Sequence, residues 1–506
     1  MMAMLPMNPD RRAFLKSAAG AFAGAPAILG QSAPRPNVLF ILADEWRAQA
    51  TGYNGDPNVR APALDRLAAE SVNFQTAVSG TPVCCPYRAS LLTGQYPLSN
   101  GVFINDVELK PKGVTMGEAF AAAGYRTGYI GKWHVYGSPD GKYGRREAYI
   151  PPASRFGFDY WKACECTHDY NHSLYYEGND PQPKYWPGYD AIAQTADAGA
   201  FIERQARTRD PFCLVLSFGP PHFPYATAPE RYQEMYRGRE IRLRPNVPPD
   251  KRQEAAEILR GYYAHMAALD DCLDRLPATL DRAGVAGDTI VVFTSDHGDM
   301  MLSQGLTTKL YPWDESIRVP FLLRYPRKLG SSRVGSKAQR IRAPLNSPDI
   351  LPTLLGLCGI RAPASVEGAD WSHVIAGGAE PPGDPGALLT LAVPITEARR
   401  YGFAEYRGLR TVRHTYVRSI RGPWLLYDNE RDPYQMHNLC GKPEARDVQR
   451  RMDGALDREL KRRHDEFLPA AEYVKRAGLG HYGEVNVKVG RHPSPWGDWD
   501  STLPPL

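Results

Sequence analysis

The sequence has few cysteines and no long apolar run, and both shortages restrict what the protein can be. Its 506 residues include only eight cysteines, too few for a fold held together by disulfide bonds. No segment reaches the roughly 20 consecutive apolar residues of a membrane-spanning helix, so stable membrane insertion is not expected. Acidic and basic residues nearly balance at a net charge of +5, and no Lys/Arg block is present, so nucleic-acid binding is not indicated.

The remaining composition is that of an ordinary globular protein. Hydrophobic residues make up 43% of the chain and charged residues 23%, close to the averages for folded proteins. Glycine and proline are frequent, at 46 and 45 residues, but follow no collagen-like repeat. A prior of about 150 residues per domain predicts one large domain with a smaller companion.

The first 33 residues resemble an export signal. Arg11 and Arg12 precede Phe14 and Leu15, and residues 17–30 form a mildly apolar run rich in Ala and Gly. This run is too short to span a bilayer but suits the central part of an export signal. The arginine pair is typical of twin-arginine signals, so we expect a periplasmic or secreted protein. The alternative is a frayed basic terminus.

Strand patterns alternate with helix patterns along most of the remaining chain. Apolar runs at 37–44 and 289–296 each end in an acidic residue, as buried parallel strands do. Among the helices that are expected, one covers 63–73, a second begins after a capping box formed by Thr115 and Glu118, and a third covers 252–280 with a break near Pro277. The pattern predicts an α/β fold with a large mixed, mostly parallel sheet sandwiched by helices.

The pattern changes in the last quarter of the chain. Residues 361–394 are rich in Pro, Gly and Ala, as in a connection, and short strand patterns with a charged amphipathic helix follow. We therefore predict three parts: a signal at 1–33, a catalytic α/β domain at 34–390, and a C-terminal α+β subdomain with a tail at 391–506.

Two predicted strands end in groups that bind metals. Asp44 and Glu45 follow one strand, and Asp296 and His297 follow the other. Ligands of open α/β sheets bind at the carboxyl ends of strands, and neighbouring carboxylates repel one another, so a divalent cation is expected between them. Oxygen-rich ligands favour Ca²⁺, Mg²⁺ or Mn²⁺. From spacing alone, these residues could equally cap the helices that follow.

Two further motifs resemble the signatures of the sulfatase family. Residues 84–94, CCPYRASLLTG, resemble C-x-P-S-R-x-x-x-L-T-G, and residues 124–134, GYRTGYIGKWH, match G-Y-x-T-x-x-x-G-K-x-H. The resemblance continues through 36–44, 217–224, 294–320 and 426–439. It implies a sulfatase of the alkaline phosphatase superfamily, in which a signature cysteine becomes formylglycine and its hydrated aldehyde attacks the sulfur atom of a sulfate ester.

The resemblance assigns a role to each matching position. Cys84, unlike Cys85, has Pro at +2 and Arg at +4, so Cys84 would be oxidised by a formylglycine-generating maturation enzyme. The metal, most simply Ca²⁺, would be held by Asp44, Glu45, Asp296, His297 and the modified Cys84. Lys132 and Lys309 would neutralise the sulfate, and Arg88 would hold the nucleophile. His134 would accept a proton during sulfate release, and His222 would protonate the leaving alcohol.

Three positions depart from the family pattern. Tyr87 replaces the usual Ser, Glu45 stands where Asp or Gln is commoner, and Gln304 stands where a histidine often occurs. None of them removes a residue of the expected catalytic set.

The substrate is the least determined part of this interpretation. The aromatic segment 135–190 predicts a substrate wall or a packed lid, and within it His168, Asp169, Asn171 and His172 are candidate contacts to a sulfated small molecule or oligosaccharide. The CxC pair at Cys164 and Cys166 is expected to be structural.

Two alternative functions stay open at this point. One is a phosphonate monoester or phosphodiester hydrolase of the same superfamily, which can share the formylglycine and the Asp-His metal pair. The other is a catalytically silent carbohydrate-binding relative, against which the complete set of Cys84, Lys132, His134 and Lys309 argues.

Overall fold

The computed structural model describes residues 35–138, 146–208, 210–326, 339–395, 398 and 401–480. The expected signal at 1–33 and most of the expected tail lie outside these residues. Within the described ranges, no helix combines the length and apolar character that crossing a membrane requires.

The main sheet has ten strands in the order β12-β2-β11-β9-β1-β8-β4-β5-β6-β7. Its central strands β9, β1, β8, β4 and β5 are parallel to one another, whereas β11 pairs antiparallel with β9 and β6 pairs antiparallel with β5, at the two edges of this core. The strands are β1 (Asn37–Asp44), β2 (Val72–Phe74), β4 (Arg126–Lys132), β5 (Tyr160–Cys164), β6 (Leu174–Glu177), β7 (Lys184–Tyr185), β8 (Phe212–Pro221), β9 (Thr289–Ser295), β11 (Phe321–Arg324) and β12 (Gln339–Ile341). The predicted mixed, mostly parallel sheet is thus confirmed.

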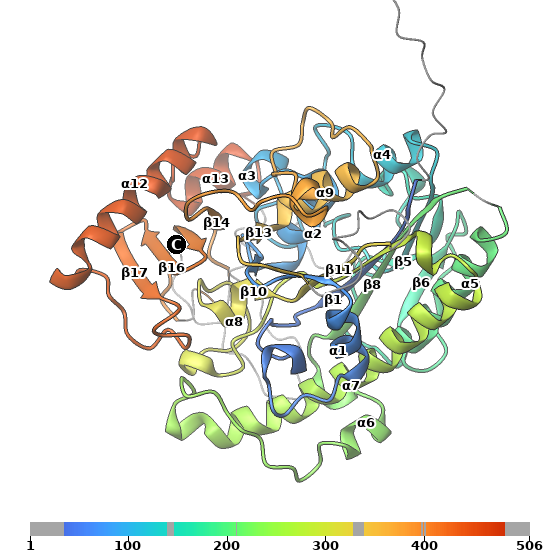
Figure 1. Ribbon diagram of the computed structural model, residues 1–506, viewed down its shortest axis with the longest axis horizontal. Coiled ribbons are helices and arrows are strands. Elements are labelled where there is room, and N and C mark those ends of the chain that lie inside the picture. Colours follow the sequence, from blue (N-terminus) through green and yellow to red (C-terminus); the bar gives the residue numbers. More distant parts are fainter. Residues whose placement is uncertain are drawn as a thin grey trace, which may run out of the picture. The chain divides into compact units, whose positions relative to one another are not determined.

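Helices cover both faces of this sheet because successive side chains of each strand point to opposite faces. On β1, Phe40 and Leu42 pack with α2 (Cys84–Thr93), α4 (Met116–Ala122) and α9 (Ile350–Leu357). Leu39 and Ile41 pack with α1 (Pro62–Ala69), α5 (Asp190–Gln205) and α7 (Arg252–Arg282). Figure 1 shows the two groups of helices on opposite sides of the sheet. The continuous apolar run of β1 therefore reflects burial on both sides.

A second, antiparallel sheet forms near the C-terminus. Its order is β14-β15-β16-β17, with bounds Gly386–Leu391, Tyr406–Thr411, His414–Ser419 and Gly422–Asp428. Leucines of α12 (Arg446–Arg462) cover one face of it. This sheet and the main one belong to a compact unit that begins at Pro36, and the division at residue 390 stays a prediction. β14, however, lies within the segment predicted as a connection, so that expectation was wrong for residues 386–391.

The remaining elements are short. β3 (Ala77–Val78), β10 (Arg318–Val319) and β13 (Leu345–Asn346) form a small sheet. The short helices are α3 (Pro97–Asn100), α6 (Glu230–Glu234), α8 (Asp314–Ile317), α10 (Ser372–Ile375) and α13 (Ala470–Arg476).

Two expected helix features were wrong. The helix predicted over 63–73 ends at Ala69, and residues 72–74 form β2, which pairs with both β11 and β12. The break near Pro277 is absent, since α7 continues to Arg282. Leu273, Leu276 and Leu280 are buried against the sheet, and this packing offsets the loss of one backbone hydrogen bond at proline. The capping box is confirmed, because the Thr115 N–H donates to the Glu118 carboxylate at 2.9 Å.

Candidate active site

The carboxyl ends of β1 and β9 lie side by side in the sheet. The two strands are parallel and pair Ala43 with Ser295, so Asp44 and Asp296 follow at adjacent positions. Both carboxylates are fully buried. The backbone N–H of Glu45 donates to Asp296 Oδ1 at 3.1 Å, which ties the two strand ends together.

Cys84 is the first residue of α2, and its thiol points at this pair of strand ends. Its Sγ lies 3.2 Å from His297 Nε2 and 3.9 Å from Asp44 Oδ1. Burial and the Asp44 carboxylate would raise the pKa of the thiol, but Lys132, Lys309 and His297 together hold that pKa well below its usual value. The helix N-terminus adds further positive potential at position 84. An anion is therefore favoured there.

Arg88 lies one helical turn after Cys84 and joins the two acidic residues. Its Nη2 donates to Asp44 Oδ2 and to Asp296 Oδ2, both at 3.0 Å. Its Nη1 donates to Ser217 Oγ at 2.8 Å and to the carbonyl of Lys132 at 3.0 Å. The planar guanidinium group can make these contacts at once because its donors point in fixed, divergent directions. Arg88 thus fixes three strand ends relative to Cys84.

Lys132 reaches the site from the end of β4. Its Nζ lies 2.6 Å from Asp44 Oδ2 and 3.9 Å from Cys84 Sγ. Burial works against the charged amine, but the Asp44 carboxylate outweighs it and raises the pKa of Lys132 well above normal. The preceding Gly131 has φ 100°, and a Cβ there would lie 2.0 Å from the carbonyl oxygen of Ser217. The signature glycine is therefore needed for close approach of β4 to β8.

Glu45, His222 and Lys309 form a second cluster beside the first. Lys309 Nζ lies 3.2 Å from Glu45 Oε2 and 2.7 Å from His222 Nε2, and His222 Nε2 is 3.1 Å from Glu45 Oε2. Tyr225 donates its hydroxyl to Glu45 Oε1 at 2.7 Å. Burial raises the pKa of Glu45 to about 8 despite the opposing effect of Lys309. Glu45 has φ 70°, a conformation that is uncommon for a residue with a Cβ and that occurs mainly where surrounding structure enforces it.

The first cluster has the composition of a divalent cation site. The ligand atoms of Asp44, Cys84, Asp296 and His297 all lie within 4.8 Å of one another. Burial, and next the charge of Asp44, raise the pKa of Asp296, as expected for buried carboxylates that repel each other. A hard divalent cation would relieve that repulsion, and oxygen and imidazole ligands suit one. Glu45 is not in this group but in a separate one with Asp44 and His222.

His134 lies at the end of the second signature, in a left-handed backbone conformation with φ 56°. Its Nε2 is 3.6 Å from Asp106 Oδ1, which is an ion-pair distance too long for a hydrogen bond. Both ring nitrogens are buried without a hydrogen-bond partner among the described residues. Burial opposes protonation, but Cys166 and Cys85 raise the pKa of His134 well above its usual value. No hydrogen bond or ion pair in the described ranges joins it directly to Cys84.

Only one of the four candidate substrate contacts approaches these clusters. The His168 ring stacks on the His222 ring with centroids 4.6 Å apart and planes 10° apart. Asp169, Asn171 and His172 are exposed and make contacts within their own loop or to Thr227 and Tyr185. In the described ranges, none of these three makes a hydrogen bond or ion pair to the catalytic candidates.

The aromatic segment extends the main sheet through β5, β6 and β7. Cys164 and Cys166 are both buried and free, and Cys166 Sγ lies 3.8 Å from His168 Nε2. The expected structural role of the CxC pair remains a prediction.

Three supporting residues were missed in the sequence. Ser217 lies within the segment 217–224, where the resemblance gave a signal, but its bond to Arg88 could not be read from spacing. Asp106, which lies near His134, and Tyr225, which donates to Glu45, belong to none of the quoted motifs. Contacts across 28 and 180 positions of sequence leave no local pattern.

Comparison with known proteins now decides the family. The Sulfatase family model matches residues 36–360, and the model for the C-terminal part of N-sulphoglucosamine sulphohydrolase matches residues 303–462. The chain belongs to the sulfatase family. As a sulfatase it is a sulfuric ester hydrolase, and it belongs with enzymes that depend on a metal and on formylglycine.

Other sulfatases are similar to this chain over most of its length. The chain is 46% identical to an ulvan-active sulfatase of Formosa agariphila over 444 residues, covering 87% of this chain and 84% of the relative. It is 30% identical to an endo-4-O-sulfatase of Bacteroides thetaiotaomicron, covering 82% of this chain and 90% of that protein. The solved structure of the sulfatase-like protein yidJ of Bacteroides fragilis superimposes with a TM-score of 0.76 at 28% identity, covering 88% and 98% of the two chains.

Proposed function

We propose that this protein hydrolyses sulfate esters on a carbohydrate, with formylglycine derived from Cys84 as the nucleophile. The observation that supports this most is the position of Cys84 itself. Its Sγ, which stands where the modified residue would carry its oxygen atoms, lies 3.2 Å from His297 Nε2 and 3.9 Å from Lys132 Nζ. The hydrated aldehyde would supply both the attacking oxygen and a second hydroxyl for sulfate release.

Two cations would bind the sulfate group, and a third would hold the residues around it. Lys132 and Lys309 both act on the charge at position 84, where each lowers the pKa of the thiol. They would stabilise the negative oxygens of the sulfate, which stay charged in the transition state. Arg88, with its hydrogen bonds to both Asp44 and Asp296, would hold the ligands rather than the substrate.

Asp44, Asp296, His297 and the modified residue 84 would hold a divalent cation, which we propose is Ca²⁺ because carboxylate oxygens predominate. Such a cation supplies Lewis-acid polarisation of sulfate oxygens and lowers the pKa of the attacking hydroxyl. Glu45 would join from the neighbouring cluster, where it now contacts Lys309. Mn²⁺ or Mg²⁺ would fit the same ligand types.

Two histidines would move protons in separate steps. His222 lies 2.7 Å from Lys309 in the second cluster and would protonate the departing alcohol. His134 matches the family position that takes a proton during sulfate release. Because its pKa is raised, it would first have to release its own proton, and its two ring nitrogens have no hydrogen-bond partners in the described chain. The stacked His168 would fix the plane of the His222 ring and border the substrate.

A sulfated carbohydrate is the proposed substrate class. One relative is named for activity on ulvan and another as an endo-4-O-sulfatase, and these names support a sulfated carbohydrate. We further propose that the twin-arginine-type segment at 1–33 directs the protein to the periplasm or the exterior. The cysteine would be modified beforehand in the cytosol by a formylglycine-generating enzyme.

Two measurements test this proposal. Mass spectrometry of the peptide 81–88, from a host with the maturation enzyme, should show formylglycine at position 84. Parallel turnover of an aryl sulfate and an aryl phosphonate monoester should favour the sulfate. An unmodified thiol in active protein would overturn the nucleophile assignment, and preferred phosphonate turnover would favour the phosphonate monoester hydrolase alternative.

A further inference from the structure

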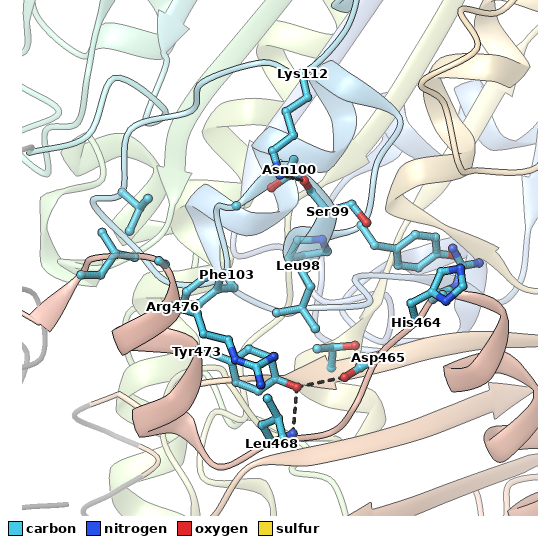
Figure 2. A pocket seen from close by; sticks show the side chains of 18 of the residues that line it. Leu98, Ser99, Asn100, Phe103, Lys112, His464, Asp465, Leu468, Tyr473 and Arg476 are labelled. Carbon is cyan, nitrogen blue, oxygen red and sulfur yellow. Dashed lines mark hydrogen bonds between the residues drawn. The ribbon is translucent and has the colours of Figure 1, made fainter.

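A cavity of about 680 Å³ lies outside the candidate active site. Its walls come from α3 and the following residues 101–112 on one side, and from residues 463–468 after α12 and from α13 on the other. Figure 2 shows Phe103 from the first part beside Tyr473 and Arg476 from the second, with Lys112 extending toward Asn100 and Ser99. None of the residues proposed for catalysis or metal binding lines it. Its volume is in the range of small-ligand sites, about 300–1,000 Å³.

The lining combines apolar rings with polar groups at the rim. Phe103 and Tyr473 pack together with ring centroids 6.2 Å apart. The Tyr473 hydroxyl is held by Asp465 at 2.9 Å and by the N–H of Leu468 at 3.0 Å, as the dashed lines in Figure 2 show. The packed rings of Phe103 and Tyr473, with charged side chains around them, suit a ligand that has both apolar faces and polar substituents.

The charge balance of the lining favours an anionic ligand. Its three acidic residues are already paired with cations, since Asp465 forms an ion pair with Arg407, Glu466 accepts from Arg476 at 2.8 Å, and Glu108 lies 3.9 Å from Lys110. Lys112 instead donates to the neutral carbonyl of Ser99 at 2.8 Å. Among the ion pairs of the described chain it has no carboxylate partner. Its positive charge is therefore available to an anion.

The cavity wall is continuous with the support of the active site. Asp106, which lies 3.6 Å from His134, is followed directly by Val107 and Glu108, which line the cavity. A long ligand held here would raise the local concentration of its remaining units at the protein.

We propose that this cavity is a second binding site for sulfated oligosaccharide, separate from the catalytic cluster. The inference rests on the proposed function for the choice of saccharide. The site would retain a polymer chain while the catalytic cluster acts on another part of it, so small aryl sulfates would not depend on it.

The test uses the full chain with Cys84→Ala, titrated calorimetrically with sulfated oligosaccharides prepared from ulvan. We expect binding beyond a single site, and Lys112→Glu with Arg476→Glu should weaken the additional binding about tenfold or more. Lys475→Glu, an exposed lysine on the same helix that does not line the cavity, is the matched control and should bind like the parent. Lys112→Ala alone is a milder variant, and thermal unfolding checks that each variant folds.

Several results would overturn the inference. One is unchanged oligosaccharide binding in the charge-reversed variant. Another is displacement of the oligosaccharide by inorganic sulfate alone as effectively as by a second oligosaccharide. A third is additional binding that appears only after removal of residues 481–506. Turnover of 4-nitrophenyl sulfate by the Lys112→Glu, Arg476→Glu protein with Cys84 intact should equal that of the wild type. If the wild type turns over no sulfate ester while the additional binding is present and charge-dependent, the proposed function fails and this inference stands.

Discussion

The ammonium group of Lys309 lies 2.7 Å from Nε2 of His222. On the other side of the ring, Nδ1 is 3.1 Å from the carbonyl oxygen of Phe223. Because a carbonyl can only accept, Nδ1 carries the hydrogen and Nε2 accepts from Lys309. Burial and the Lys309 charge both lower the pKa of His222 well below its usual value. The proton between the two side chains is therefore carried by Lys309, and His222 could protonate the alcohol only with a proton received from Lys309 through this hydrogen bond.

This relationship predicts that the two residues will not act independently in catalysis. His222→Ala and Lys309→Ala should each reduce kcat/KM for an alkyl sulfate by about 10²–10⁴-fold. The double variant should lose little more than the worse single variant, since residues that act as a unit are non-additive. Steady-state kinetics with all three variants checks this.

The leaving group provides the control for that experiment. With 4-nitrophenyl sulfate, which releases a stable phenolate, His222→Ala should cost much less activity than with an alkyl sulfate. His373→Ala changes an exposed histidine of α10 and should leave both rates unchanged. Losses that multiply in the double variant would contradict the coupling.

Arg88 is expected to dominate the stability of the site. Arg88→Ala removes the guanidinium that donates to both buried carboxylates and leaves Lys132 to donate to Asp44, so the free energy of unfolding should fall by about 3–5 kcal/mol. The matched control is Arg66→Ala, which removes an exposed ion pair with Asp274 and should cost less than about 1 kcal/mol. Urea unfolding of the two variants makes the comparison, and similar losses in both would refute the bridging role.

Metal removal should destabilise the folded protein. Without a cation the buried carboxylates of Asp44 and Asp296 repel, so a chelator should lower the thermal midpoint, and metal at about 100 times its Kd should restore about 2.7 kcal/mol. Asp296→Asn should abolish this response, whereas Asp169→Asn, at an exposed position, should keep it. Calcium, magnesium and manganese added back separately identify the preferred ion. A thermal midpoint that does not respond to any of them would contradict the metal site.

Local pattern was enough for the parts of the fold that are buried on both faces. β1 spans the predicted residues because its apolar run meets helices on both sides of the sheet. β2 was missed because its three residues are a strand only through pairing with β11 and β12, which lie more than 240 positions away. The helix predicted over 63–73 was extended across β2 because the helix propensity of a residue contains no information about the strands with which it pairs.

The candidate site was likewise predictable in part. The convergence of Asp44, Asp296 and Cys84 was predictable because strand ends and a family signature marked each of them. The separation of Glu45 from that group was not, since it depends on Lys309, His222 and Tyr225 surrounding its carboxylate. Spacing in the sequence cannot tell which of two adjacent acids turns toward which cluster.

A last prediction concerns Asp270 of α7, which caps α1 from a distance. Pro62 is the first residue of α1 and has no N–H, and the next two N–H groups, of Ala63 and Leu64, donate to Asp270 at 3.0 and 2.8 Å. Burial raises the pKa of this carboxyl to about 6 despite those bonds. An acid whose pKa is higher in the folded state contributes stability at low pH, and the contribution is lost as pH rises through the folded pKa.

The free energy of unfolding should therefore follow pH differently in the wild type and in Asp270→Asn. The wild type should lose stability relative to the variant between about pH 4, near the pKa of an unfolded Asp, and the folded value of about 6. Above that range the difference should be constant, because the carboxyl is ionised in both states. Urea unfolding of both proteins across this range measures the difference, and a wild type that gains stability relative to the variant as pH rises would show that the cap prefers its charged form.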